Sequence, residues 1–331
     1  MTLTPRLALL MTLPPLMWAG NAIVGRLVVD LVPPLTFNLL RWLLALALLL
    51  PLAWRALRPW SRVRQRWGYL LVIGSLSVGL YNALQYAALV TSPPLNVTLV
   101  ASSTPVWMLA IGALFFAEKP RPRQLLGAAL GLTGVLVVLG RGSLEVLLNV
   151  RFVAGDLLVL LAAIGWALYS WLLVRPPAHM RGAARPRADE GWDWAGLLLL
   201  QVMFGLLPAA LFAAGEQAVG AAVPVRWGWP LLAALLYVSV CASLLAYRAW
   251  GLAVAQGGPA LAAFFANLTP LFAALLSAAV LGETPRPFHA GAFVLIVAGI
   301  AVSSSGAAKE TAQKTAQTST VKTTEKTAPK K

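Results

Sequence analysis

The sequence predicts an all-α integral membrane protein whose ten transmembrane helices form two inverted repeats of five. Ten apolar stretches follow one another along the 331 residues, and each is close to the roughly 20 residues that a helix needs to cross a bilayer. The chain is 59% hydrophobic and 11% charged, with a mean hydropathy of +0.77, whereas a soluble domain carries roughly 25% charged residues. The apolar surplus therefore indicates a membrane protein rather than a large soluble core.

Each expected span is one apolar stretch bounded by polar or basic residues. The spans are Leu7–Val29, Leu35–Trp54, Tyr69–Val90, Leu95–Ala117, Gln124–Leu139, Asp156–Val174, Trp194–Ala213, Trp229–Leu252, Ala260–Leu281 and Phe288–Ser303. The first of them is interrupted by Pro14 and Pro15 and carries Asn21 and Arg26. Such a stretch is unlike the apolar region of a cleaved signal peptide, so it is assigned as a span of the mature protein.

Motifs in the second five spans repeat those in the first five. Thr104 and Pro105 in span 4 correspond to Thr269 and Pro270 in span 9, and the Glu-x-Pro-Arg-Pro segment after span 4 recurs after span 9. Because five is odd, two such copies enter the membrane in opposite senses, which is typical of secondary transporters. We expect a first repeat over residues 1–140, a periplasmic linker over 141–155, a second repeat over 156–305 and a tail over 306–331.

The basic residues indicate the orientation in the membrane. Most Lys and Arg lie after spans 2, 4 and 6 and in the tail, and positive charge favours the cytoplasmic side. Both termini are therefore expected in the cytoplasm. The tail is rich in Thr, Lys and Ala without an apolar face, which predicts disorder. Since the net charge of +15 lies between spans and in the tail, we expect a lipid bilayer and a small solute as partners, and no nucleic acid.

The chain resembles a known family of transporters. The two five-span repeats, Trp18-Ala19-Gly20-Asn21 in span 1, the Thr-Pro pairs and the Glu-x-Pro loops resemble the EamA-type members of the drug/metabolite transporter superfamily. Within it, the resemblance is to bacterial inner-membrane exporters of amino acids and metabolites. It implies a basket-like bundle without a cofactor, in which spans 1, 3, 4, 6, 8 and 9 surround a central cavity. Spans 2 and 7 would flank the cavity, and spans 5 and 10 would pack on the remote side.

Polar and aromatic side chains occur within those same six spans, where they are costly unless they face protein or water. The candidates for a solute pathway are Trp18, Asn21, Tyr81, Gln85, Ser103, Trp107, Trp166, Tyr169, Ser243, Tyr247 and Asn267. Aromatic walls with a few polar groups suit amino acids and related solutes with an apolar body. The alternative is a structural role, in which Ser bonds its own helix and Asn joins two helices.

Other tryptophans fit the interfacial belt, because they lie near span ends. They are Trp54, Trp194, Trp227, Trp229 and Trp250.

No Asp or Glu lies in the middle of a span. A transporter that exchanges protons for cations commonly needs such a carboxylate, so the pattern favours facilitated diffusion of amino acids by alternating access. A multidrug or organic-cation exporter, with or without proton coupling, remains an alternative, as does a channel. A membrane-embedded enzyme would need a nucleophile, a base or a metal cluster at the membrane surface, and the sequence offers none.

Two arginines, Arg41 and Arg248, lie inside spans 2 and 8, away from the loops. Arg248 lies near the cytoplasmic end of span 8, from which its side chain can reach the interface. Arg41 lies about two turns inside span 2. One possibility is a structural role, in which Arg41 pairs with a carbonyl or reaches outward. The other is contact with a solute carboxylate. Because span 2 is expected to be peripheral, the structural role is favoured.

Proline and glycine predict bends and close contacts. Pro105 and Pro270 lack an N–H, so each frees the carbonyl four residues earlier and bends its helix. We expect these matched bends to act as hinges; a static bend is the alternative. Gly127 and Gly131 form a GxxxG pattern in span 5, which packs either a dimer partner or span 10 of the same chain. The contact within the chain is favoured, and we expect a monomer or a weak homodimer.

Overall fold

The computed structural model describes residues 3–219, 224–281 and 286–305, and all regular structure in these ranges is helical. Ten helices in this part are long and apolar enough to cross a membrane, and they follow the ten predicted stretches in order. The expected disorder of the tail and the expected second Glu-x-Pro loop, which starts at Glu283, lie outside the described residues.

Six of the spans are continuous helices. They are α1 (Pro5–Leu27), α2 (Pro34–Ala53), α8 (Pro122–Leu139), α10 (Ala154–Val174), α11 (Trp194–Ala218) and α16 (Pro287–Ser304). A short turn, η1 (Trp54–Leu57), extends α2. Several of these helices begin with proline, whose missing N–H costs nothing in the first turn. The carboxylate of Glu216 on α11 accepts the backbone N–H groups of Leu35 and Thr36 at 2.9 and 2.8 Å, so α11 caps α2.

The four other spans are interrupted, and the interruptions match between the repeats. Spans 3 and 8 each contain a π-helical segment: α4 (Trp67–Gly74), η2 (Ser75–Leu80) and α5 (Tyr81–Ala88), and α12 (Trp229–Tyr237), η6 (Val238–Leu245) and α13 (Ala246–Gly257). Spans 4 and 9 are each broken by a turn, between α6 (Pro94–Ala101) and α7 (Thr104–Phe116), and between α14 (Pro259–Ala266) and α15 (Thr269–Leu281). Such π segments are rare and are frequently found at functional sites.

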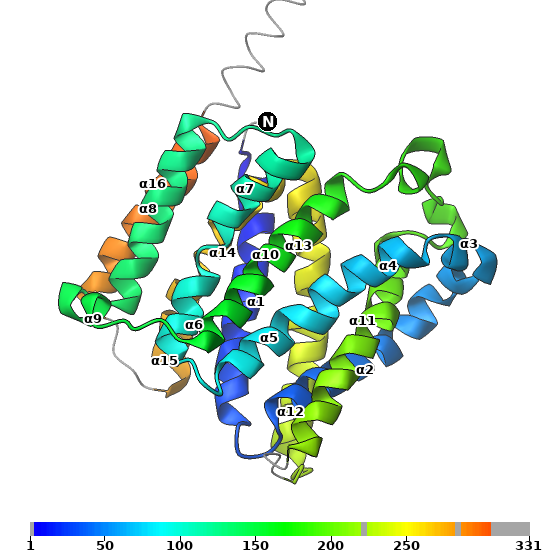
Figure 1. Cartoon of the computed structure of the whole chain (residues 1–331), viewed down its shortest axis with the longest axis horizontal. Coiled ribbons are helices and arrows are strands. Elements are labelled where there is room, and N and C mark those ends of the chain that lie inside the picture. Colours follow the sequence, from blue (N-terminus) through cyan, green and yellow to red (C-terminus); the bar gives the residue numbers. More distant parts are fainter. Residues whose placement is uncertain (1–2, 220–223, 282–285, 306–331) are drawn as a thin grey trace, which may run out of the picture.

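The bundle has a centre and two flanks. Helices α1, α10 and α13 lie centrally, α8 and α16 pack together at one edge, and α2 and α11 pack together at the opposite edge (Figure 1). Glycine permits the closest of these contacts, because a Cβ atom added to Gly127 would lie 2.7 Å from the carbonyl oxygen of Gly299. This confirms that the Gly127 pattern of α8 contacts span 10 of the same chain.

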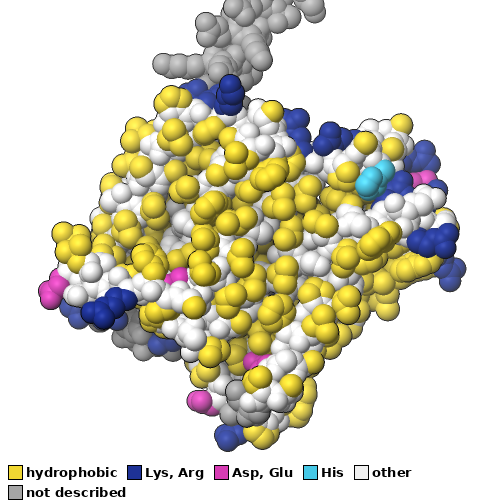
Figure 2. All heavy atoms as spheres, in the orientation of Figure 1, with side chains coloured by type: hydrophobic (Ala, Val, Ile, Leu, Met, Phe, Trp, Pro, Cys, Tyr) yellow, Lys and Arg dark blue, Asp and Glu magenta, His cyan; other side chains and the backbone are white. Residues whose placement is uncertain are grey.

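The start of α1 and the end of α16 lie at the same end of the bundle (Figure 1). Apolar side chains cover the middle of the face shown in Figure 2, and Lys and Arg gather towards its rims, as expected for a protein that crosses a bilayer. The ends of α7 and α10 are joined by an ion pair between Glu118 and Arg175.

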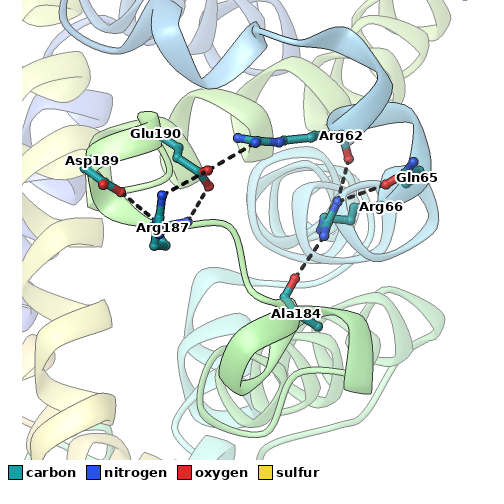
Figure 3. Close-up of polar contacts among 7 residues, drawn as sticks. All are labelled: Arg62, Gln65, Arg66, Ala184, Arg187, Asp189 and Glu190. Atoms are coloured by element: carbon teal, nitrogen blue, oxygen red, sulfur yellow. Dashed lines mark hydrogen bonds and ion pairs between the residues drawn. The ribbon is translucent and has the colours of Figure 1, made fainter.

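Two connecting segments contact one another on the side of the bundle that holds α2 and α11 (Figure 1). They comprise α3 (Trp60–Gln65) between spans 2 and 3, and η3 (Ala178–Met180), η4 (Gly182–Ala184) and η5 (Ala188–Glu190) between spans 6 and 7. Arg62 forms an ion pair with Glu190 at 3.1 Å, and Arg66 donates to the carbonyl of Ala184 at 2.9 Å (Figure 3). A further short helix, α9 (Leu144–Leu148), lies between the repeats.

Candidate functional site

The centre of the bundle is occupied by a cluster of aromatic rings gathered around Trp166. We call this the central aromatic cluster, and its members are Trp18, Tyr81, Trp166, Tyr169, Tyr247 and Trp250. The ring of Trp166 lies 5.4 Å from Trp18 and 4.7 Å from Tyr81. It lies 5.0, 5.6 and 5.3 Å from Tyr169, Tyr247 and Trp250. These spacings are those of favourable aromatic pairs, so four spans meet at one side chain.

Several polar tips of the cluster are paired with neighbouring helices. The Trp18 indole N–H donates to the Ala242 carbonyl at 3.2 Å, and that of Trp250 donates to the Ser170 hydroxyl at 3.1 Å. The Tyr247 hydroxyl donates to the carbonyl of Ser77 in η2 at 2.7 Å. A buried polar group without a partner is costly, so these bonds hold the rings in defined orientations.

Gln201 of α11 also belongs to this polar shell, although the sequence pattern does not single it out. Its side chain is buried and its Oε1 atom accepts a hydrogen bond from the Tyr169 hydroxyl at 3.1 Å. The available signal is that Gln201 is an isolated amide inside an otherwise apolar span. An amide in such a place marks either a helix contact or a pathway.

Arg41 reaches the centre of the bundle from α2. Its side chain is 1% exposed; Nε donates to the Ser243 hydroxyl at 3.2 Å, and Nη1 donates to Asn21 Oδ1 at 3.4 Å. Its Cζ atom lies 4.9 Å from the centre of the Trp42 ring, and that ring lies 5.1 Å from Tyr247. The structure thus brings two predicted residues, Asn21 and Ser243, together around an arginine that was expected to be peripheral.

The Thr-Pro pairs lie at the breaks in spans 4 and 9. The hydroxyl of Thr104 donates to the carbonyl of Ala101 at 2.6 Å, and that of Thr269 donates to the carbonyl of Ala266 at 2.7 Å. These are the carbonyls that Pro105 and Pro270 are predicted to free, because proline has no N–H for its own helix. Each threonine therefore satisfies the acceptor that its neighbouring proline releases.

The remaining candidates lie outside the cluster or at its edge. The Trp107 indole donates to the Ser103 hydroxyl at 3.1 Å, a contact within one helix turn, and Gln85 is a hydrogen-bonding neighbour of Tyr81. Asn267 lies at the break between α14 and α15, where its Nδ2 atom approaches Gly131 of α8. The structure thus places Asn267 at a helix contact away from the cluster.

One tryptophan assignment is wrong. Trp250 was assigned to the interfacial belt, but it is 1% exposed and its ring contacts Trp18 and Trp166. The reason is that span 8 continues to Gly257, so Trp250 lies about two turns inside the helix rather than at its end. The other belt residues are exposed at or near span ends; they are Trp54, Trp194, Trp227 and Trp229.

A ten-span helical bundle built from inverted repeats around a polar and aromatic centre defines an integral membrane transporter. The model of the EamA-like transporter family matches residues 6–140 and 153–305. The chain therefore belongs to the EamA-like transporter family, and it is a multi-pass membrane transporter rather than an enzyme.

Several relatives align with most of the chain. A transporter of Archaeoglobus fulgidus is 28% identical over 302 residues, covering 90% of this chain and 96% of the relative. A probable amino-acid metabolite efflux pump of Salmonella typhimurium is 28% identical, covering 87% and 91%. The aromatic amino acid exporter YddG of Ancylobacter novellus is 28% identical, covering 68% and 71%. A crystal structure with 24% identity aligns with a TM-score of 0.70 over 90% of this chain and 96% of that chain, and so shares the fold.

Proposed function

We propose that the protein exports amino acids or related small metabolites across the bacterial inner membrane by alternating access. The observation that carries this proposal is the central aromatic cluster, in which four spans meet at Trp166. Rings that can stack on an apolar side chain, next to a few fixed polar groups, suit a solute with both an apolar body and polar ends. The names of the Salmonella and Ancylobacter relatives support the same class of solute.

The transport cycle in this proposal needs no ion. The middle of every span lacks Asp and Glu, so no carboxylate is available there to alternate between a proton and a solute. Net movement then follows the solute gradient. The breaks at Pro105 and Pro270 lie in matching spans of opposite sense and serve as the joints that open the centre to one side at a time. Both termini face the cytoplasm in this arrangement.

The proposal is tested by uptake of a panel of labelled amino acids into proteoliposomes without an ion gradient. We expect saturable uptake, which falls about ten-fold in Trp166→Ala because the ring contacts of the solute are lost. Trp229→Ala is the matched control, since Trp229 is exposed at the start of α12. Trp166→Phe, which keeps a ring, is expected to retain most of the uptake. A size-exclusion profile checks the fold of each variant.

Each alternative predicts a different result. Uptake that requires a proton gradient would replace the uniporter with a coupled transporter. Movement of quaternary ammonium compounds without any amino acid would indicate a drug exporter. Single-channel currents in planar bilayers would indicate a channel.

A further inference from the structure

Among the residues that the structure describes, Arg41 is a buried charge without a countercharge. Its hydrogen bonds go to neutral side chains, those of Asn21, Ser243 and Tyr86, and the Tyr247 hydroxyl lies near it as well. Within the described ranges, no carboxylate forms an ion pair with it. A guanidinium has five N–H donors and is always charged, so these three partners leave part of its donor capacity unused.

Such a charge is expensive to keep inside a membrane. Placing an arginine inside a membrane helix is strongly unfavourable, and residues of this kind usually serve a function with a definable partner. The strongest partner of a guanidinium is a carboxylate, which it binds with two parallel hydrogen bonds.

The face of α2 around Arg41 carries further polar groups that lack partners. Asn38 is 1% exposed, and neither Nδ2 nor Oδ1 of its amide has a hydrogen bond; the indole Nε1 of Trp42 has none either. Asn38 lies one helical turn before Arg41 and Trp42, so these groups share a face of the helix. Buried polar groups are nearly always bonded, and their concentration here indicates that they meet a polar ligand.

This group is continuous with the central aromatic cluster. The ring of Trp42 lies under the Arg41 guanidinium and contacts Tyr247 at 5.1 Å, and Tyr247 contacts Trp166 at 5.6 Å. A solute whose acidic end meets Arg41 can therefore extend its apolar body along the rings.

We infer that Arg41, with Asn38 beside it, binds the carboxylate of the transported solute. The inference rests on the proposed function and adds its specificity: the site selects solutes with a carboxylate and an apolar body, and it disfavours organic cations. The positive charge of Arg41 repels a cation at the same place that attracts an acid.

Uptake and binding of phenylalanine and phenylalaninamide test the inference, because the amide keeps the ring and the amine but replaces the carboxylate with a neutral carboxamide. The wild-type protein in proteoliposomes is expected to take up phenylalanine at least about ten-fold better than the amide. In Arg41→Gln this preference is expected to disappear, through loss of phenylalanine uptake. Arg41→Lys should recover part of it, because lysine keeps the charge but not the two-pronged donor. Asn38→Leu should weaken it several-fold.

A matched control and a second readout keep folding apart from recognition. Arg248→Gln removes an exposed arginine of span 8, which stacks at 4.3 Å on Trp194, and it should leave the preference unchanged. In detergent, phenylalanine should raise the thermal midpoint of the wild type and of Arg248→Gln, but not that of Arg41→Gln.

Two results would overturn the inference. If Arg41→Gln still prefers phenylalanine to its amide, Arg41 does not bind the carboxylate and only the inference fails. If the wild type moves and binds neither compound nor any other amino acid, the proposed function fails as well.

Discussion

Replacing Gly299 with alanine should push α16 away from α8. A Cβ atom at this position would lie 2.7 Å from the carbonyl oxygen of Gly127 and 3.0 Å from the backbone nitrogen of Gly131. Both are backbone atoms, which cannot turn aside as a flexible side chain can. Overpacking of this kind costs about 1–3 kcal/mol, and in a membrane the loss matters because close packing is a main source of helix association.

Gly291→Ala is the matched control, since Gly291 is exposed on the same helix and nothing described lies within 4 Å of an added Cβ atom. Both variants gain the higher helix propensity of alanine, up to about 1 kcal/mol. The difference between them therefore isolates the steric cost. Reversible unfolding in mixed detergent micelles, followed by tryptophan fluorescence, should give a free energy of unfolding about 1–3 kcal/mol lower for Gly299→Ala.

Equal stability of the two variants would refute this reasoning, because it would mean that α8 and α16 are not in close contact. The measurement also separates the two possible roles of the GxxxG pattern. Since the contact between α8 and α16 lies within one chain, the mass of the protein–detergent complex should be the same for both variants. A shift from dimer to monomer in Gly299→Ala would instead place a partner subunit on this surface.

Two further predictions concern movement and pH. Pro105→Ala combined with Pro270→Ala restores the missing N–H groups and should slow amino acid uptake several-fold without lowering the thermal midpoint; an unchanged rate would refute the hinge. The backbone N–H of Arg187, with the Arg62 guanidinium adding to it, lowers the pKa of Glu190 below its usual 4.5. The stabilising effect of the Glu190 carboxylate should be complete above pH 4.5 and lost as the pH falls through its lowered pKa. The wild type should therefore unfold at a higher temperature than Glu190→Gln at pH 7, and at the same temperature in strong acid.

Local sequence chemistry was sufficient to predict the spans and two of their special features. A bilayer demands long apolar helices, so the span pattern follows from composition alone. The breaks at Thr104 and Thr269 follow from the prolines next to them, and the α8–α16 contact follows from the spacing of Gly127 and Gly131. In each case a single residue type limits the backbone.

The π-helical segments and part of the centre could not be predicted in this way. The segments Ser75–Leu80 and Val238–Leu245 have the composition of ordinary apolar helix, and only packing distinguishes them. The sequence favoured a structural role for Arg41 because its span was expected to be peripheral. Its long side chain nevertheless reaches Ser243 on another span. Its importance depends on which helices surround it, and a single sequence does not contain that information.

The symmetry of the repeats bears on how binding and movement are divided between residues. Trp18 and Trp166 lie midway along the first helix of each repeat, and their rings meet at 5.4 Å. Tyr81 and Tyr247 each follow the π segment of matching spans. These pairs give the centre similar surroundings from its two halves, which in our proposal supports alternating access.

One pair of matched positions differs in charge. Arg41 lies as far from the start of α2 as Gln201 lies from the start of α11, and both are buried beside the central aromatic cluster. One position therefore supplies a cation and the other a neutral amide bonded to Tyr169. In our proposal the matched features allow the protein to move between its inward-open and outward-open states. The difference in charge fixes where the acidic end of the solute binds. Substitution at Arg41 would then change which solute is transported. The matched breaks and rings would stay the same, and so would the transport cycle.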